Sequence, residues 1–403
     1  MQLYHHNGLR RLAQLSALAA LSASSLVNVN AVAVAAAPAA AFSPLSVTFV
    51  SSLTGWALGW APCKVAGACL ALRRTTDGAE AWSVEPVPRG LAATADKKAY
   101  GQPLLLNAGP GSWLNVRFAD PADGWIYGGL PNGGPLLWST HDGGTFWHQL
   151  PVTGLYPDDP VFDLEAAAGT VYLMAMGQDE TVTVESSPVG LDASHKDPTP
   201  ALTLPAGGAQ PGGSIVLEAR HGWLVEGNDR GVTGSAVLEK DGHWTTWAPP
   251  CEAVGDSYAV PAPSNGADLV AVCVMGGFAS PLSKSAPPGA SLGSSWLYFS
   301  TDGGKSFHHG PELLPRRDYF GGVLASPRPG VVVTDRSEGN SEQLIASFDN
   351  GRHWEAVYQG YFFYLGFTSP TEGVGLVRLS SGTGRSMMVM TYDGGHHWSK
   401  VNF

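Results

Sequence analysis

Four arginines are the cationic side chains in this sequence whose positions suggest ligand chemistry. Arginine suits a carboxylate ligand because its guanidinium fork can bind both carboxylate oxygens. The four lie in or near segments that we expect to form inner strands, and could face a central pocket: Arg117, Arg220, Arg336 and Arg378. The competing interpretation, which we favour, is that they are solvated charges at strand ends.

An acidic stretch supplies the carboxyl groups that a hydrolase would need. It contains Asp158, Asp159, Asp163 and Glu165. Hydrolysis of a glycosidic bond uses two carboxyl groups on either side of that bond. No spacing marks any two of these four as such a pair, so we interpret the stretch as a solvated acidic loop.

Seven histidines recur beside the predicted turns, and adjacent pairs of histidines can bind metals. They are His141, His148, His308, His309, His353, His396 and His397. Their recurrence at variable turn positions instead predicts solvent-facing side chains. A phosphate loop is missing from the sequence, which removes one common catalytic motif. We therefore expect no metal, no cofactor and no catalytic residue that the sequence can identify.

A repeated turn organises the chain after residue 43. Its pattern is Ser/Thr-x-Asp-x-Gly followed by an aromatic residue, with full copies at Asp142, Asp302, Asp349 and Asp393 and degenerate copies at Asp77 and Asp241. The aspartate can accept hydrogen bonds from the backbone N–H groups that follow it. The glycine supplies the positive φ that closes the turn. These aspartates are therefore predicted to be structural.

A second unit precedes each turn and fixes the length of the repeat. It is a strand, a polar turn, then Gly-Trp or Gly-Val, as in Val47–Phe49 followed by Gly55-Trp56. The glycine lies 18 to 22 residues before the turn aspartate in five units, and an insertion lengthens a sixth. The 99-residue gap between Asp142 and Asp241 is twice the usual period, and Gly169 lies where a strand-opening copy belongs.

Seven repeats of roughly 52 residues follow from this spacing, a length typical of four-stranded propeller blades. The sequence thus predicts an all-β, seven-bladed β-propeller of antiparallel blades at residues 42–403. The third blade lacks its turn motif. The blades are expected at about 43–90, 112–152, 160–187, 213–250, 256–312, 319–358 and 361–403.

The repeated turn resembles the Asp-box, or BNR repeat, of the sialidase superfamily. The Val-x-Phe, Gly-Trp and Thr-x-Asp-Gly-Gly-x-x-Trp cadence is closest to that of photosystem II assembly-factor-like secreted bacterial propellers, and the resemblance covers about 43–403. It implies that the Asp-boxes lie on the blade periphery and are structural. A sialidase-like hydrolase would also need three convergent arginines, a Tyr–Glu pair and an acidic Asp. The Phe/Tyr-Arg-Ile-Pro motif of that family is missing here.

The N-terminus has the pattern of an export signal. Arg10 and Arg11 precede a long Ala/Leu/Val/Ser run that ends at Ala41, which is typical of a secretory signal peptide. We predict cleavage near Ala41, leaving 42–403 as the mature domain. Removal of the two arginines changes the formal net charge from −11 to −13.

Four cysteines fit the oxidising compartment to which such a signal leads. Three disulfide connectivities are open. Local pairing of Cys63 with Cys69 and of Cys251 with Cys273 is the economical prediction. We therefore expect a secreted or extracytoplasmic protein, with no stable membrane insertion once the signal is removed.

Composition argues against one class of partner and leaves a binding scaffold and a carbohydrate-active protein as the two functions to weigh. The acidic balance, 34 Asp+Glu against 23 Lys+Arg, argues against nucleic acid as a partner. We favour a non-enzymatic exported scaffold, monomeric, that binds an unknown protein or glycan through long loops at Arg89–Gly111, Ser186–Gly213 and Gly277–Ser294. The alternative is a carbohydrate-active protein, a glycoside hydrolase or a glycan binder, that uses the central funnel.

Overall fold

The computed structural model describes most of the chain after residue 41. The described residues are 42–63, 69–94, 114–129, 135–152, 161–176, 181–192, 195–196, 202–203, 212–228, 231–239, 242–251, 258–265, 267–274, 295–314, 318–338, 341–379 and 385–403. The predicted signal peptide and Asp241 lie outside these ranges, as do Asp158 and Asp159 and most of the three predicted recognition loops. No helix of the described residues is long and apolar enough to cross a membrane.

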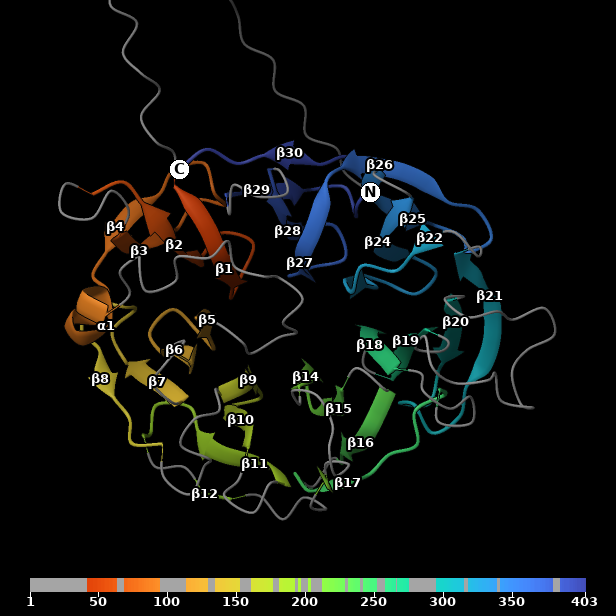
Figure 1. Cartoon of the computed structure of the whole chain (residues 1–403), viewed down its shortest axis with the longest axis horizontal. Helices are drawn as coiled ribbons and strands as arrows, with labels where there is room; N and C mark the ends of the chain where they lie inside the picture. The colour runs from red at the N-terminus through yellow and green to blue at the C-terminus, as the bar shows by residue number, and fades with distance from the viewer. Residues whose placement is uncertain are drawn as a thin grey trace, which may run out of the picture. The chain divides into compact units, whose positions relative to one another are not determined.

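Seven antiparallel sheets form a ring, one sheet per blade (Figure 1). Their strands, blade by blade, are β1 (Ser43–Phe49), β2 (Gly55–Ala61), β3 (Cys69–Thr75) and β4 (Ser83–Glu85); β5 (Asn115–Phe118), β6 (Gly124–Gly129), β7 (Pro135–Thr140) and β8 (His148–Gln149); β9 (Val161–Ala167), β10 (Thr170–Met176), β11 (Thr181–Pro188), β12 (His195–Lys196) and β13 (Leu202–Thr203); β14 (Gly212–Glu218), β15 (His221–Asn228), β16 (Gly231–Leu238) and β17 (Trp244–Thr246); β18 (Tyr258–Asn265), β19 (Asp268–Val274), β20 (Ser295–Ser300) and β21 (His308–Leu314); β22 (Asp318–Tyr319), β23 (Leu324–Ala325), β24 (Val332–Glu338), β25 (Ser341–Ser347) and β26 (Glu355–Gln359); β27 (Tyr361–Phe367), β28 (Gly373–Arg378), β29 (Ser386–Thr391) and β30 (Ser399–Lys400). The predicted seven-bladed propeller is confirmed.

Two blades have a divided strand, yet every blade keeps four strand positions. In blade 3, β12 and β13 both pair with β11 and together make the outer strand. In blade 6, β22 and β23 both pair with β24 and together make the inner strand. One short helix, α1 (Arg89–Thr94), occupies the start of a segment for which we predicted an irregular loop.

The recurring Phe…Gly-Trp pattern in the sequence reflects close packing between the first two strands of a blade. A Cβ atom on Gly55 would lie 2.6 Å from the Phe49 ring, and one on Gly124 would lie 2.4 Å from the Phe118 ring. Glycine is therefore required where the inner-strand phenylalanine lies over the second strand. The ring of Phe118 also stacks on Trp56 of the preceding blade, with centroids 3.7 Å apart, so the same residues join neighbouring blades.

Polar side chains of one blade satisfy the open inner edge of the next. An unpaired strand edge leaves backbone N–H groups that need acceptors. Ser46 Oγ accepts a hydrogen bond from the Val116 N–H at 3.1 Å, and Thr48 Oγ1 accepts one from the Phe118 N–H at 3.4 Å. These two hydrogen bonds fix the position of β5 relative to β1, and therefore of blade 2 relative to blade 1.

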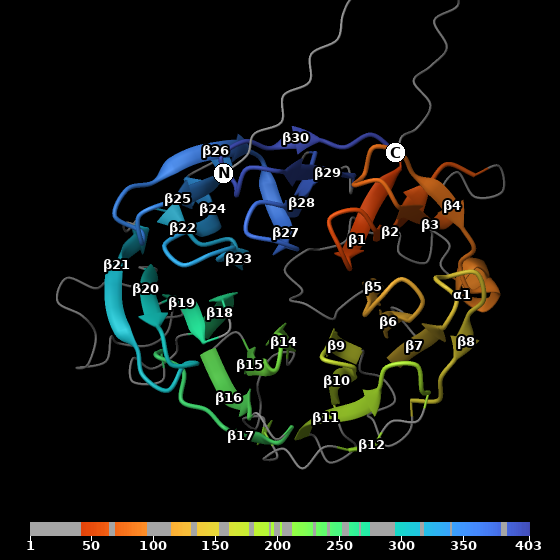
Figure 2. The same cartoon turned by 180° about the vertical axis from the view of Figure 1, so that it is seen from behind.

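Within the part of the chain that the structure describes, the ring closes by packing between the first and last blades, without exchange of strands. Blade 1 contains only β1–β4 and blade 7 only β27–β30, and the two lie side by side in Figure 1 and from behind in Figure 2. Ser43 Oγ accepts a hydrogen bond from the Ser386 N–H at 2.9 Å. The Phe403 ring packs against Phe42 and Trp82, with centroids 4.6 and 4.8 Å away.

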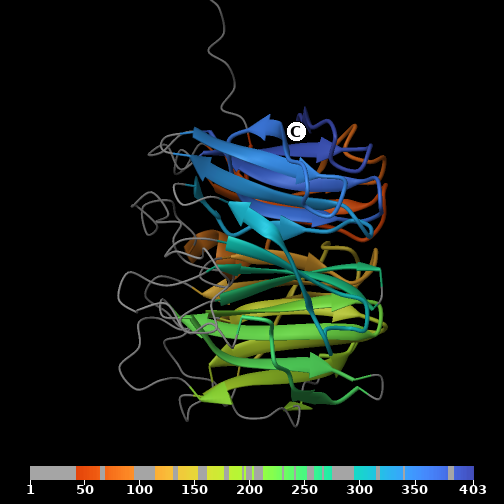
Figure 3. The ribbon, with the colours of Figure 1, turned by 90° about the vertical axis from the view of Figure 1, so that its right-hand side faces the viewer.

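The last strand is shorter than the predicted segment Trp398–Phe403. Only Ser399 and Lys400 pair as β30, although the Val401 N–H still donates to the Met388 carbonyl at 2.9 Å. Beyond that point, Phe403 turns to the blade 1 contact instead of continuing along β29. Seen from the side, most strands run roughly across the view, and their arrowheads point both ways, as antiparallel pairing requires (Figure 3).

Both predicted disulfides are present. Cys63–Cys69 joins the ends of β2 and β3 within blade 1. Cys251–Cys273 joins the segment after β17 to β19 and is buried. The second bond therefore links blade 4 to blade 5 covalently, a role that the local spacing did not indicate.

Candidate functional site

The repeated turns place each described aspartate in a closed network of local hydrogen bonds. In blade 6, Asp349 Oδ1 accepts from the His353 N–H at 2.9 Å and from the Ser347 hydroxyl at 2.9 Å. The same geometry recurs at Asp77, Asp142, Asp302 and Asp393. A hydrogen bond from the Ser306 hydroxyl, joined by backbone donors, lowers the pKa of Asp302. These carboxylates are ionised, and their oxygens accept hydrogen bonds from donors within their own turns.

The Ser or Thr at the start of each turn accepts a hydrogen bond that is more buried than those accepted by the aspartate. Ser347 is fully buried, and its Oγ accepts from the Gly351 N–H at 2.8 Å. The equivalent bond is made by Thr75, Thr140, Ser300 and Thr391. The sequence pattern includes this Ser/Thr position, but it does not by itself predict a hydrogen bond for it.

Replacing Ser347 with Ala is expected to destabilise the protein more than replacing Asp349 with Ala. The first change leaves the buried Gly351 N–H without an acceptor, at a cost of about 1–3 kcal/mol. Water can replace the exposed Asp349 carboxylate, so that loss is smaller. Chemical denaturation of the two variants measures the difference. A larger loss for Asp349→Ala would contradict the assignment.

A buried polar cluster lies between the inner strands of blades 2 and 3. Arg117 on β5 forms an ion pair with Glu165 on β9, and their side chains are 21% and 20% exposed. Asp163, two residues before Glu165, is almost completely buried. The interpretation of this stretch as a solvated acidic loop is therefore wrong for Asp163 and Glu165, because their strand faces the neighbouring blade.

Asp163 joins three blades. Its Oδ1 accepts from the Tyr127 hydroxyl at 3.1 Å and from the Leu164 N–H at 2.9 Å. Its Oδ2 accepts from the Ile215 N–H of β14 at 2.8 Å. Both carboxylate oxygens therefore accept hydrogen bonds from donors that are buried away from water.

Burial dominates the electrostatics of this cluster. Burial raises the pKa of Glu165, although the charge of Arg117 opposes that rise. Burial, together with the charge of Asp163, also raises the pKa of Tyr127. A tyrosine with a raised pKa is a poor nucleophile at neutral pH, so the Tyr127–Asp163 contact suits a structural role.

The four candidate arginines lie on different parts of the ring. Arg117 is on the innermost strand of blade 2, whereas Arg220 is exposed in the turn between β14 and β15. Arg336 and Arg378 lie on the second strands of blades 6 and 7. The Arg378 guanidinium lies over the Tyr361 ring at 4.7 Å. Among the four, Arg117 alone is on an innermost strand.

Two turn histidines contact a neighbouring blade: His141, and His396 of blade 7, whose Nδ1 lies 3.6 Å from Glu355 of β26 and whose ring stacks on Phe348. His141 Nδ1 lies 2.6 Å from Asp123, and its Nε2 lies 3.2 Å from Asp192 of blade 3. By contrast, His353 and His397 are 89% and 87% exposed and contact only the aspartate of their own turn. The prediction of solvent-facing histidines describes those two well but misses the contacts that His141 and His396 make with neighbouring blades. Among the described residues no group of three His, Cys, Asp or Glu could hold a metal ion.

The clamp formed by His141, Asp123 and Asp192 is expected to stabilise the fold at low pH. Burial lowers the pKa of His141, but the hydrogen bond to Asp123 and the two carboxylate charges raise it overall. Protonated His141 therefore stabilises fully below its unfolded-state pKa of about 6.5. That contribution is lost as the pH rises through the higher folded-state pKa.

The melting temperatures of the parent and His141→Gln test this clamp. The parent is expected to exceed the variant by more at about pH 5.5 than at about pH 9. Asp192→Asn is the matched control and should lose part of the difference. An equal gap at both pH values would contradict the clamp.

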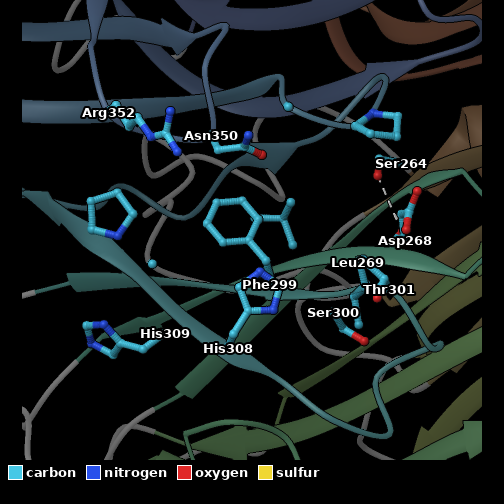
Figure 4. Close-up of a pocket in the computed structure, with 15 residues that line it drawn as sticks. Ser264, Asp268, Leu269, Phe299, Ser300, Thr301, His308, His309, Asn350 and Arg352 are labelled. Atoms are coloured by element: carbon cyan, nitrogen blue, oxygen red, sulfur yellow. Dashed lines mark hydrogen bonds between the residues drawn. The ribbon is translucent and has the colours of Figure 1, made fainter.

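A pocket of about 560 Å³ opens between blades 5 and 6. Its floor includes Phe299 on β20, with His308 of β21 stacked beside it at a centroid distance of 5.8 Å. Asp268, at the start of β19, and Asn350 and Arg352, in the blade 6 turn, lie at the sides (Figure 4). The Asp268 carboxylate and the Arg352 guanidinium have no hydrogen-bond or ion-pair partner in the part of the chain that the structure describes.

No sequence pattern predicts this pocket. His308 and His309 are recognisable in the sequence only as turn residues, and Asp268 and Arg352 belong to no motif that indicates a site. The pocket depends on the distance between two blades, which no local pattern reports.

The seven antiparallel sheets define this chain as a seven-bladed β-propeller. No protein-family model matches the sequence, and no curated protein matches it. Among solved structures it is similar to YCF48 bound to a D1 peptide, with 18% identity, a TM-score of 0.52, and 87% of this chain and 93% of that chain covered. It is also similar to the BP39L lectin from Burkholderia pseudomallei, with 12% identity, a TM-score of 0.55 and coverage of 89% and 98%.

A third similar structure is the β-propeller domain of the Trilobed protease from Pyrococcus furiosus, described as having an open velcro topology. The identity is 9%, the TM-score 0.50, and the coverage 90% of this chain and 98% of that one. At these identities the similarity concerns the fold alone.

Proposed function

We propose that this protein is an exported, non-enzymatic scaffold and that the pocket between blades 5 and 6 takes part in binding its partner. The predicted export signal and the two disulfides support an extracytoplasmic location. The turn geometry supports structural Asp-boxes of the BNR type in a sialidase-superfamily propeller. Two of the similar propellers are described with a peptide or as a lectin, which supports binding as the use of this fold.

The observation that supports the proposal is the contrast between the pocket and the polar cluster of Arg117, Asp163 and Glu165, called the central cluster below. In the pocket, Asp268 and Arg352 face the side of a cavity without a protein partner. In the cluster, Asp163 is bound by three donors and Glu165 by Arg117. Groups that are already paired hold blades together, whereas unpaired groups around a cavity are available to a ligand.

Site-specific photo-cross-linking in the cells that export the protein tests this location. A photoreactive amino acid replaces Arg352, at the pocket, or Lys305, which occupies the equivalent turn position of blade 5 outside it. We expect adducts from position 352 and none from position 305, and loss of the adducts when Asp268→Lys is added. Adducts of equal yield from both positions would contradict the proposal.

The competing function is a glycoside hydrolase that uses the central cluster. It would need Glu165 as an acid or base and a second free carboxyl group nearby. A panel of fluorogenic glycosides tests it, with Glu165→Gln as the control. We expect no turnover beyond that of Glu165→Gln. Turnover by the parent that Glu165→Gln abolishes would replace the scaffold proposal with an enzyme.

A further inference from the structure

We propose that the pocket between blades 5 and 6 binds a neutral sugar residue of a glycan, an inference that rests on the proposed binding function of this pocket. Three features of the cavity favour such a ligand: the polar groups around it, the aromatic side chain in it, and its size.

Hydrogen-bond donors and acceptors are mixed around the pocket. The Arg352 guanidinium is a donor only, and the Asp268 carboxylate is an acceptor when ionised. The Asn350 amide supplies both kinds of group, and its side chain has no protein partner among the described residues. A sugar hydroxyl both donates and accepts, so a ring carrying several hydroxyls can use all three side chains at once.

This mixture distinguishes a sugar from a charged ligand. An anion would require donors alone, and the Asp268 carboxylate would repel it. A cation would meet the same conflict at Arg352. The two formal charges cancel, which leaves a pocket whose polarity suits a neutral, polyhydroxylated ligand.

Phe299 supplies the apolar surface that the carbon-bound hydrogens of a sugar ring need. It is partly buried on β20 and lies between Asn350 and His308 (Figure 4). Pro311 and Pro329 extend the apolar lining. An aromatic side chain with a few polar groups around it is the general composition of a small-molecule site.

The volume is also suitable. About 560 Å³ falls within the range of about 300–1,000 Å³ for ligand pockets, and is larger than one sugar ring requires. The pocket therefore accepts one residue of a chain while the neighbouring residues remain in solvent.

An array of neutral and acidic glycans, probed with the full exported chain, tests the inference. We expect binding to neutral glycans, followed by calorimetric titration of the strongest one. Arg352→Ala and Asp268→Ala should each weaken the affinity about five- to ten-fold, as expected for the loss of one hydrogen bond. Phe299→Leu should weaken it while preserving an apolar side chain.

Lys305→Ala is the matched control, since it removes a cation from the equivalent turn outside the pocket. It should leave the affinity unchanged. Thermal melting of each variant separates lost binding from lost folding. Glycan binding that all three pocket variants retain would overturn the inference.

The outcome also distinguishes this inference from the function on which it rests. If position 352 formed adducts to a protein and no glycan bound on the array, the proposed sugar ligand would be wrong and the proposed scaffold function would stand. An absence of both adducts and array binding would overturn both. Preference for acidic glycans would contradict the neutral ligand and indicate that Arg352 dominates.

Discussion

Deleting Trp398–Phe403 is expected to open the propeller ring and make the chain aggregate. Trp398 is buried against Phe362 and Phe367, and Phe403 packs on Phe42 and Trp82 of blade 1. Loss of a buried tryptophan alone costs about 3–5 kcal/mol. Because the described strands of blades 1 and 7 form separate sheets, this packing is a large part of the closure.

Size-exclusion chromatography and thermal melting measure the effect. The truncated chain should elute partly as oligomers and melt at a lower temperature, since the apolar faces of blades 1 and 7 become exposed. A control with Ser399→Ala and Lys400→Ala, whose side chains are exposed, should resemble the parent. A truncated chain as monomeric and heat-stable as the parent would contradict this account of closure.

Replacing Asp163 with Ala is expected to lower the free energy of unfolding by about 3 kcal/mol or more. The change leaves the Leu164 and Ile215 N–H groups and the Tyr127 hydroxyl without their acceptor. Each buried donor left unsatisfied costs about 1–3 kcal/mol. Denaturant unfolding of the purified protein measures the loss.

Asp268→Ala is the opposite case and serves as the control. Its carboxylate has no protein partner among the described residues, so its loss should leave stability unchanged and reduce binding. Asp163→Ala should reduce stability and leave the pocket intact. If Asp163→Ala folded as stably as the parent, the three-blade role of Asp163 would be wrong.

The fold could be predicted because its signals are local and repeated. The turn at Asp393, for example, closes within the residues Thr391–Trp398. The Phe367 and Gly373 packing likewise lies within one blade. Such patterns recur at a fixed spacing, so each copy strengthens the assignment of the others.

The sites could not be predicted because they depend on contacts between blades. Asp163 and Ile215 are 52 residues apart, and His141 and Asp192 are 51 apart. Asp268 and Arg352 line one pocket although they come from different blades. The order of residues along a strand fixes which face a side chain occupies, but not which residue of the next blade lies opposite.

Hydrogen–deuterium exchange tests most directly whether function resides in the pocket between blades 5 and 6. The full chain would be measured alone and with the ligand that the glycan array selects, or with the protein captured at position 352. The account predicts slower exchange in β20 and β21 and in the blade 6 turn that contains Asn350 and Arg352, with no change in β5 and β9. Slower exchange confined to β5 and β9 would place binding at the central Arg117–Glu165 cluster and contradict the account.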